Sequence, residues 1–161
     1  MTVAVTLHNH PEIEQARAQA PAEVRAEIVS GALLMAPAPR TRHQVASANL
    51  YLVLQQEITR RRRQGPPSQP GAWRLIPVPE LHLGVGPDKL NPDLAGWRTE
   101  RAPSLDDYPI VIAPDWVCEV LSPSTEAHDR AVKLPAFASH GTTHAWLIDP
   151  ELKRLEVYRV T

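Results

Sequence analysis

The sequence predicts a single α/β (α+β) domain with an N-terminal β-hairpin, a long helix and a central sheet. Three observations predict it. Two short strand-like runs meet at a Ser-Gly turn, one long helical pattern follows, and the apolar run 116–121 precedes a further helix and strand. The length of 161 residues suits one hydrophobic core. We therefore expect a lead-in over residues 1–22 and a single domain over residues 23–161.

The first half of the chain contains a lead-in, a hairpin and a helix. Residues 1–20 show no sustained periodicity, which predicts a frayed segment or a short helix. Residues 26–35 predict two short strands around Ser30-Gly31. A helix is expected from Thr41 to Arg63, because apolar residues recur there at helical spacing and form one stripe. The stripe consists of Ala46, Leu50, Val53, Leu54 and Ile58. The segment 64–71, rich in glycine and proline, ends the helix.

The second half predicts mostly strands. Three are expected at 73–78, 81–85 and 93–97, whereas Asp88 and the residues after it predict a plain turn. The run 116–121 is apolar on both faces apart from Glu119, which predicts a central strand covered on both sides. A helix is expected over 126–139, closed by His140-Gly141, with a kink at Pro135. Strands at 145–148 and 155–158 complete the pattern.

Composition limits the kinds of partner. The net charge of −1 gives no global attraction to polyanions, so such a partner would need a local basic patch. Cys118 is the only cysteine, which excludes an intramolecular disulfide and a multi-cysteine metal site. The N-terminus lacks a signal-peptide pattern, and no apolar run approaches the ~20 residues needed to cross a bilayer. We expect a soluble cytoplasmic protein without membrane contacts.

Glu119 and Asp93 are candidate metal ligands. An ionised carboxylate in a buried strand costs several kcal/mol unless a cation or hydrogen bonds compensate it. A structural carboxylate bonded to a neighbouring loop is an equal alternative for Glu119. Asp93 follows Asn91-Pro92 and precedes an apolar run, so it can project from a strand end, although Pro-Asp is also common in turns. Asp115 is a poor partner for Glu119, because four strand residues separate them by roughly 13 Å.

Lys133 is a candidate for the same site. A helix that packs back on the sheet can return a long lysine to the end of the strand, but taken alone it is better explained as a surface residue. Two carboxylates and a lysine together suggest a site for a hard cation such as Mg²⁺. Such a cation polarises a phosphoryl oxygen and acidifies an attacking water.

These motifs resemble those of a known family. The resemblance is carried by Asn91-Pro92-Asp93-Leu94-Ala95 and by residues 113–124, Ala-Pro-Asp-Trp-Val-Cys-Glu-Val-Leu-Ser-Pro-Ser. Further matches are Asp129-Arg130, Lys133-Leu134, Phe137-Ala138, residues 146–150, the hairpin residues 27–31 and His43. The chain resembles the Uma-two family of restriction-endonuclease-like proteins, in the PD-(D/E)XK superfamily, over roughly residues 23 to 160.

The resemblance implies a restriction-endonuclease-like mixed sheet flanked by helices, and a Mg²⁺ or Mn²⁺ site formed by Asp93, Glu119 and the carbonyl of Val120. In the wider superfamily a lysine lies two residues after the glutamate, where this chain has Leu121. The resemblance suggests that Lys133 takes over that role. Two further departures from the family pattern are Ala32 and His144, which stand where many relatives carry acids.

Four further residues are weaker site candidates. Glu27 is either an extra acid at the metal site or a surface residue of the hairpin. His43 either contacts a substrate phosphate or a metal-bound water, or is structural. Arg40 and Arg42, with the run Arg60–Arg63 at the other end of the same helix, could bind DNA phosphates. A solvated helix end is the alternative for the run, because cations complement the helix dipole there.

The predicted function is a metal-dependent DNA endonuclease that hydrolyses phosphodiester bonds. The resemblance also implies a homodimer, since superfamily nucleases often cut two strands as dimers. Two alternatives stay open: a nuclease-like binding or assembly module without catalysis, and a structural core without a site. Convergence of Asp93, Glu119 and Lys133 on one point would favour the hydrolase. Failure of Lys133 to reach the carboxylates would favour the binding module.

Overall fold

The computed structural model describes residues 3–6, 11–65, 72–85 and 88–160. Their strands form two five-stranded sheets. The first sheet has the order β1-β3-β2-β6-β5 and comprises β1 (Val3–Thr6), β2 (Val24–Val29), β3 (Ala32–Pro37), β5 (Leu81–Leu83) and β6 (Asp88–Leu90). The second sheet has the order β10-β9-β8-β7-β4 and comprises β4 (Trp73–Pro77), β7 (Leu94–Arg98), β8 (Trp116–Val120), β9 (His144–Asp149) and β10 (Arg154–Arg159).

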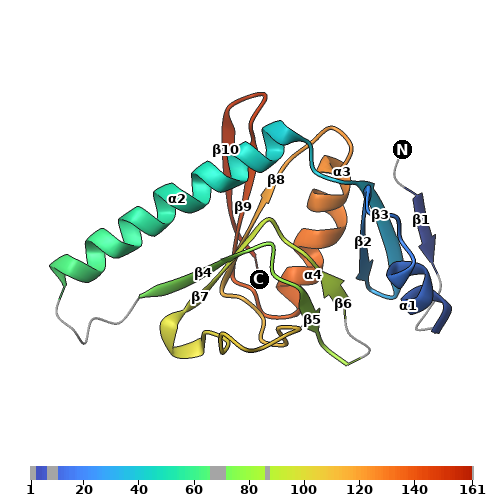
Figure 1. The fold of residues 1–161 in the computed structure, drawn as a ribbon, viewed down its shortest axis with the longest axis horizontal. Helices are drawn as coiled ribbons and strands as arrows, with labels where there is room; N and C mark the ends of the chain where they lie inside the picture. The colour runs from blue at the N-terminus through green and yellow to red at the C-terminus, as the bar shows by residue number, and fades with distance from the viewer. Residues whose placement is uncertain (1–2, 7–10, 66–71, 86–87, 161) are drawn as a thin grey trace.

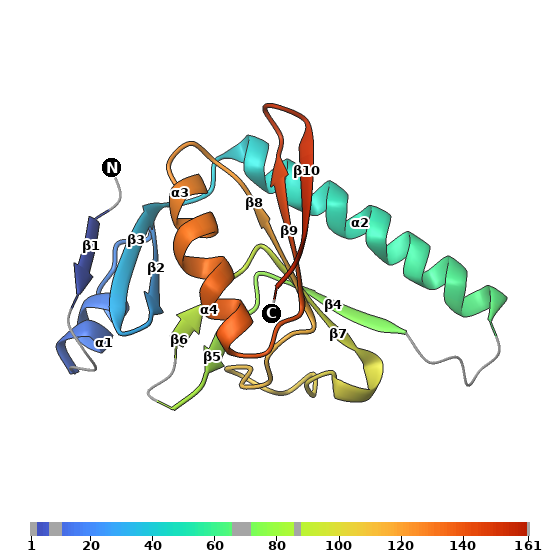
Figure 2. The same ribbon diagram turned by 180° about the vertical axis from the view of Figure 1, so that it is seen from behind.

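Helices flank the second sheet, as the predicted fold requires. This sheet is mixed, because β8 runs parallel to β9 while its other neighbouring pairs are antiparallel. The long helix α2 (Thr41–Gln64) covers one face of it. The helical segments α3 (Glu126–His128), η2 (Asp129–Lys133) and α4 (Leu134–Ser139) lie between the two sheets (Figures 1 and 2). The short helices α1 (Pro11–Ala18) and η1 (Thr99–Arg101) complete the described elements.

The hairpin β2–β3 forms where the sequence predicts it. Ser30 and Gly31 both have positive φ (51° and 74°), as the tight two-residue hairpin turn requires. The lead-in contains more order than predicted. Besides the short helix α1, it contains β1, which pairs with β3 at the edge of the first sheet. Edge pairing uses the backbone groups of β3, so side-chain periodicity gives no sign of it.

The prediction of a plain turn at Asp88 is wrong. Residues Asp88–Leu90 form β6, which joins β5 to β2 inside the first sheet. Three residues are too few to show an alternating pattern, so the strand is set by tertiary contacts. The Asp88 carboxylate accepts the Ser30 N–H at 2.6 Å and lies 2.8 Å from Nε2 of His140. The strand expected over 81–85 ends at Leu83, and Val85 is fully exposed.

Helix α2 has the predicted length but is less buried than an apolar stripe implies. Leu50, Leu54 and Ile58 pack on a cluster of the second sheet that includes Leu94 and Cys118. Val53, predicted to share the stripe, is 62% exposed, because the contact surface is narrower than the stripe. The segment 66–71, predicted to end the helix, lies outside the described residues, and the helix itself ends at Gln64. The described helices include none that is long and apolar enough to span a membrane.

The helix expected over 126–139 is continuous but irregular. Its middle, η2, is a π-helical turn in which the N–H of Leu134 bonds the carbonyl of Asp129, five residues back. Pro135 follows directly and has no N–H to donate, so a regular α-helical bond to residue 131 is impossible. The predicted disturbance at Pro135 therefore takes the form of a π-turn. Gly141 closes the helix with φ of 91°.

Strand β8 is the buried centre of the second sheet. All five of its residues are buried, which confirms the central strand predicted over 116–121. Trp97 and Trp116 are buried as well, and Trp116 packs edge-to-face on Trp146 with ring centroids 5.2 Å apart. These tryptophans therefore pack in the core.

Candidate active site

Asp93, Glu119 and Lys133 meet in one buried centre. Asp93 lies just before β7, Glu119 in β8, and Lys133 at the end of η2, with exposed fractions of 2%, 2% and 3%. The Lys133 Nζ atom is 2.7 Å from Oε1 of Glu119. The two carboxylates are linked through the backbone, because the Val120 N–H donates to Oδ2 of Asp93 at 2.8 Å. The Asp93 N–H in turn points to Oε2 of Glu119 at 3.4 Å. The convergence expected of a hydrolase is present.

Two further carboxylates surround the lysine. Glu27 of β2 is buried, not on the hairpin surface, and its Oε1 lies 3.1 Å from Nζ of Lys133. The Asn91 N–H holds the same oxygen at 2.7 Å. Asp129, which was not among the predicted site residues, is buried with Oδ1 3.9 Å from Nζ of Lys133. The available signal was its i, i+4 spacing from Lys133, which places both on one helix face.

Asp93 also has two basic neighbours. Nε2 of His43, in the first turn of α2, lies 3.0 Å from Oδ2 of Asp93, so His43 belongs to the site. Both terminal nitrogens of Arg25 donate to Oδ1 of Asp93, at 3.1 and 3.2 Å. Arg25 was not among the predicted site residues. The signal for it was position, since residues 25 and 27 of β2 lie on the same face of the strand.

Burial and neighbouring charges shift the pKa values of these groups. Burial raises the pKa of Glu119 well above its usual range. Lys133 opposes that shift, while Asp93, Asp129 and Glu27 add to it. Burial alone would lower the pKa of Lys133, but Glu119, Glu27 and Asp129 outweigh it and raise that pKa. Burial would likewise raise the pKa of Asp93, but His43, Arg25 and the Val120 N–H hold it below its usual value. The surroundings therefore favour the ammonium form of Lys133 and the carboxylate form of Asp93.

The arginines predicted to bind DNA lie outside this centre. Arg40 and Arg42 are exposed at the start of α2, where Arg42 forms an ion pair with Glu151 at 3.5 Å. The run Arg60–Arg63 lies at the other end, roughly 30 Å away along the helix axis. Arg60 and Arg61 both bond Glu57 there.

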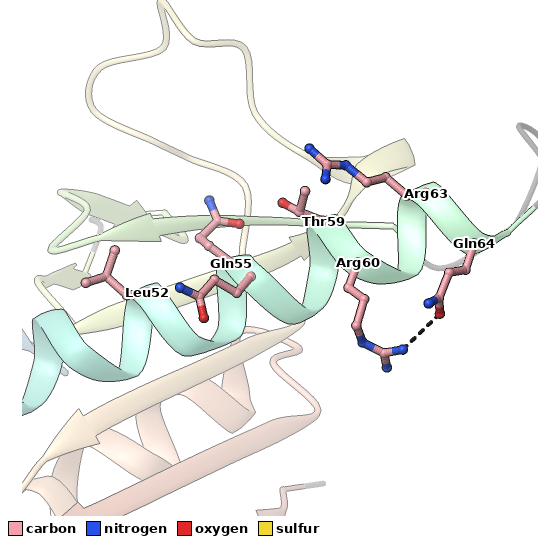
Figure 3. A pocket seen from close by; sticks show the side chains of 7 residues that line it. Leu52, Gln55, Thr59, Arg60, Arg63 and Gln64 are labelled. Atoms are coloured by element: carbon pink, nitrogen blue, oxygen red, sulfur yellow. Dashed lines mark hydrogen bonds between the residues drawn. The ribbon is translucent and has the colours of Figure 1, made fainter.

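An open hollow of about 460 Å³ lies beside the arginines at the end of α2 (Figure 3). It is lined by one face of α2, including Leu52, Gln55, Thr59, Arg60 and Arg63. None of the carboxylates of the buried centre lines it. The hollow is therefore a feature of the helix surface and separate from the candidate site.

The residues of the centre fit a hard divalent cation. Four carboxylates (Glu27, Asp93, Glu119 and Asp129) surround two basic side chains (Lys133 and Arg25), so the carboxylates outnumber the cations of the centre by two. Carboxylate oxygens are the ligands that Mg²⁺ prefers. Within the described part of the chain, no three His, Cys, Asp or Glu side chains form a ready-made metal cage. A cation here would therefore rely on few protein ligands and keep several waters, as Mg²⁺ commonly does.

Comparison with known proteins identifies the family and the fold. The sequence model of the Uma2 family, described as "Putative restriction endonuclease", matches residues 11–161. The chain belongs to the Uma2 family. A similar solved structure is a putative nuclease of DUF820 from Anabaena variabilis ATCC 29413. The two sequences are 22% identical, and the structures align with a TM-score of 0.71. The alignment covers 92% of this chain and 79% of the Anabaena protein. That likeness confirms the fold. No curated protein matches the sequence.

The departures from the superfamily pattern can now be placed. In this Uma2 chain Leu121 is a buried core residue that packs in the cluster with Leu134 and Phe137. The only ammonium that the described contacts bring to Glu119 is that of Lys133, which comes from η2. His144 is exposed at the start of β9, next to Trp116 rather than Glu119 in the β8–β9 register, so its replacement of an acid leaves the centre unchanged.

Proposed function

We propose that this chain is a Mg²⁺- or Mn²⁺-dependent DNA endonuclease that hydrolyses phosphodiester bonds. One observation carries the proposal: the Lys133 amino group and two carboxylates, Asp93 and Glu119, meet in one buried centre. Membership of the Uma2 family supports the nuclease assignment. Asp93 and Glu119 would hold the cation, with the Val120 carbonyl as the third protein ligand.

The residues of the centre have separable roles in such a reaction. The bound cation would supply a polarised phosphoryl oxygen and a more acidic water. Lys133 keeps its proton, because three carboxylates raise its pKa, so it orients the attacking water and stabilises negative charge rather than acting as a base. The Val120 N–H and His43 fix the Asp93 carboxylate in one orientation. His43 is also the neighbour of Asp93 that lies in the same helical turn as Arg42.

DNA would approach along the start of α2. Arg40 and Arg42 are exposed next to His43, so their guanidinium groups can bind phosphates while His43 contacts Asp93. Replacing both by glutamine should weaken DNA binding and reduce the slope of log K against log salt by about 2. Fluorescence anisotropy at several salt concentrations measures this slope. An Arg61→Gln, Arg63→Gln control removes equal charge at the far end of α2, and equal losses in both double variants would refute this approach path.

The experiment for the metal site is calorimetric titration of Mn²⁺ into the wild type, Asp93→Asn and Glu119→Gln, followed by plasmid cleavage. We expect binding and cleavage in the wild type and neither in the two variants. Asp115→Asn is the matched control, because Asp115 is also a buried carboxylate at a β8 end, accepting the Arg98 N–H, but it lies roughly 13 Å from Glu119. A wild type that binds no Mn²⁺, with or without DNA, would refute the hydrolase.

A second candidate function is a DNA-binding module without catalysis. The observation that favours it is that both oxygens of Asp93 already have basic partners, Arg25 and His43. This candidate predicts DNA binding that is independent of Mn²⁺ and unchanged by Glu119→Gln. The homodimer expected of superfamily nucleases belongs to the hydrolase proposal, since two copies would cut two strands. Sedimentation of the protein with a DNA duplex measures that stoichiometry.

A further inference from the structure

The hydrogen-bonding capacity of the Asp93 carboxylate is filled. Its Oδ2 accepts the Val120 N–H at 2.8 Å and lies 3.0 Å from Nε2 of His43. Its Oδ1 accepts two N–H groups of Arg25, at 3.1 and 3.2 Å. Each carboxylate oxygen has about two acceptor positions, so no position is left for a further ligand. A cation that binds Asp93 must therefore replace one of these partners.

Arg25 is the partner that can leave. The Val120 N–H is fixed in the backbone of β8, the buried central strand, and it orients Oδ2. Arg25 approaches from β2 in the other sheet, and its side chain is 20% exposed, so the guanidinium has a path to solvent. His43, the other side-chain partner of Asp93, is less exposed (13%), so Oδ1 is the oxygen whose partner has the more open path to solvent.

The guanidinium also stands where the carboxylates need positive charge. Burial alone would lower the pKa of Arg25, but the charges of Asp93, Glu119 and Glu27 outweigh burial and raise that pKa. Arg25 lines a small cavity of about 20 Å³ with Glu27, Asp129 and Lys133, which is about the space of one water molecule. A guanidinium that donates two N–H groups to one oxygen of Asp93 supplies positive charge at an oxygen that a metal ligand would use.

We propose that Arg25 is an internal counter-ion that occupies the cation position at Oδ1 of Asp93 and that a divalent cation must displace it. This inference rests on the proposed metal-dependent function. In the metal-free protein Arg25 offsets the excess negative charge of the centre. When the cation binds, Arg25 releases Oδ1 and turns toward solvent. Arg25 is thus a positioning residue that sets the affinity for the cation.

A purely structural role for Arg25 makes the opposite prediction. Arg25 also donates to the Asn91 carbonyl at 3.4 Å, so it links β2 to the segment that carries Asp93. If it only held this segment in place, its removal would disorder Asp93 and weaken cation binding. If it competes with the cation, its removal strengthens binding. The sign of the change in affinity distinguishes the two roles.

The test is calorimetric titration of Mn²⁺ into the full-length wild type, Arg25→Met and Arg17→Met at neutral pH. Methionine keeps an unbranched apolar side chain and removes the charge. We expect Arg25→Met to bind Mn²⁺ at least tenfold more tightly than the wild type. Arg17 is the matched control, because its side chain is also 20% exposed but pairs with Glu80 instead of Asp93. Its replacement should leave the affinity unchanged.

Arg25→Lys and thermal unfolding keep the proposal testable if Arg25→Met does not fold. Lysine keeps the charge but cannot place two donors on one oxygen, so its variant should bind Mn²⁺ with an affinity between those of the wild type and Arg25→Met. Without metal, Arg25→Met should have a lower Tm than the wild type and show a larger rise in Tm with Mn²⁺.

The possible failures are distinguishable. Equal or weaker binding by folded Arg25→Met, or by Arg25→Lys if only that variant folds, overturns the counter-ion role and leaves the metal site intact. No binding by the wild type or by either Arg25 variant overturns the metal site itself, and the counter-ion role with it.

Discussion

Lys133 is enclosed by carboxylates on three sides, and this arrangement fixes its chemistry. Its Nζ lies 2.7 Å from Glu119, 3.1 Å from Glu27 and 3.9 Å from Asp129. A lysine buried in an apolar pocket would lose its proton easily and serve as a base. Here the carboxylates reverse that effect and keep the ammonium charged. The same side chain type thus becomes an electrostatic group instead of a base because of its neighbours.

The surroundings of Glu119 oppose ionisation of its carboxyl group, so its protonation state affects the stability of the fold. Its pKa is raised by burial and by the other carboxylates, so the folded chain binds this proton more tightly than the unfolded chain. The contribution to stability is present below the unfolded pKa of about 4.3 and is lost as pH rises through the raised value. At pH 8 without metal, Glu119→Gln should therefore raise the free energy of unfolding by about 1 kcal/mol. At pH 4.5 the gain should shrink.

Urea unfolding in a chelating buffer at the two pH values measures this effect. Asp115→Asn is the comparison, because Asp115 bonds the Arg98 N–H and the Arg101 guanidinium and should lose stability when its charge is removed. A Glu119→Gln protein that is less stable than the wild type at pH 8 would show that Glu119 is a structural carboxylate. It would also mean that Lys133 depends on Glu119 more than on Glu27.

The sequence predicts some residues of the centre and not others. Glu119 stands out because a carboxylate interrupts an apolar strand, and Asp93 because it opens the next one. Arg25 and Asp129 do not stand out, since charged residues in a hairpin or a helix are exposed by default. Their burial depends on the approach of the two sheets, which no local pattern encodes. The family resemblance selected Lys133 and His43, and the structure brings both to the carboxylates.

The π-turn η2 connects the irregular backbone to the position of Lys133. Because the bond from Leu134 spans five residues, the turn holds one residue more than an α-helical turn, and Asp129 and Lys133 both face the centre. Pro135→Ala restores the missing N–H, so we expect the helix to return to regular α geometry and to turn Lys133 away from Glu119. DNA cleavage should fall at least tenfold, while the Tm stays equal or rises because proline opposes helix formation.

Pro150→Ala is the control for this change, since Pro150 lies in the turn after β9. Both variants lose the rigidity that proline gives the unfolded chain, so their difference isolates the helix. Cleavage at the wild-type rate by a folded Pro135→Ala protein would show that another feature imposes the π-turn.

Elements were predictable where their own side chains determine them. The hairpin, α2 and β8 follow from turn residues, helical spacing and an apolar run, and all three are confirmed. Strands β1 and β6 were missed, because each is set by pairing with a neighbouring strand. A three-residue strand such as β6 has no periodicity to detect, and its position depends on Asp88 contacting Ser30 and His140.

At the scale of the whole molecule, the centre joins parts that are far apart in the chain. Arg25 and Glu27 come from the first sheet, Glu119 from the second, His43 from α2 and Lys133 from the helix between the sheets. The carboxylates that folding brings together repel one another, and this repulsion opposes folding. Metal binding and global stability should therefore be coupled.

Because of this coupling, a bound cation should raise the thermal stability of the protein. A cation that binds only the folded state stabilises it by about 2.7 kcal/mol at a concentration of 100 times its Kd. For a domain of this size that corresponds to a rise in Tm of roughly 5–10 °C. Calorimetric scans with and without saturating Mn²⁺ should show this rise in the wild type and none in Asp93→Asn, with Asp115→Asn retaining it. An equal rise in Asp93→Asn would place the bound cation elsewhere, because Asp93 is the carboxylate that the Val120 N–H orients for the site.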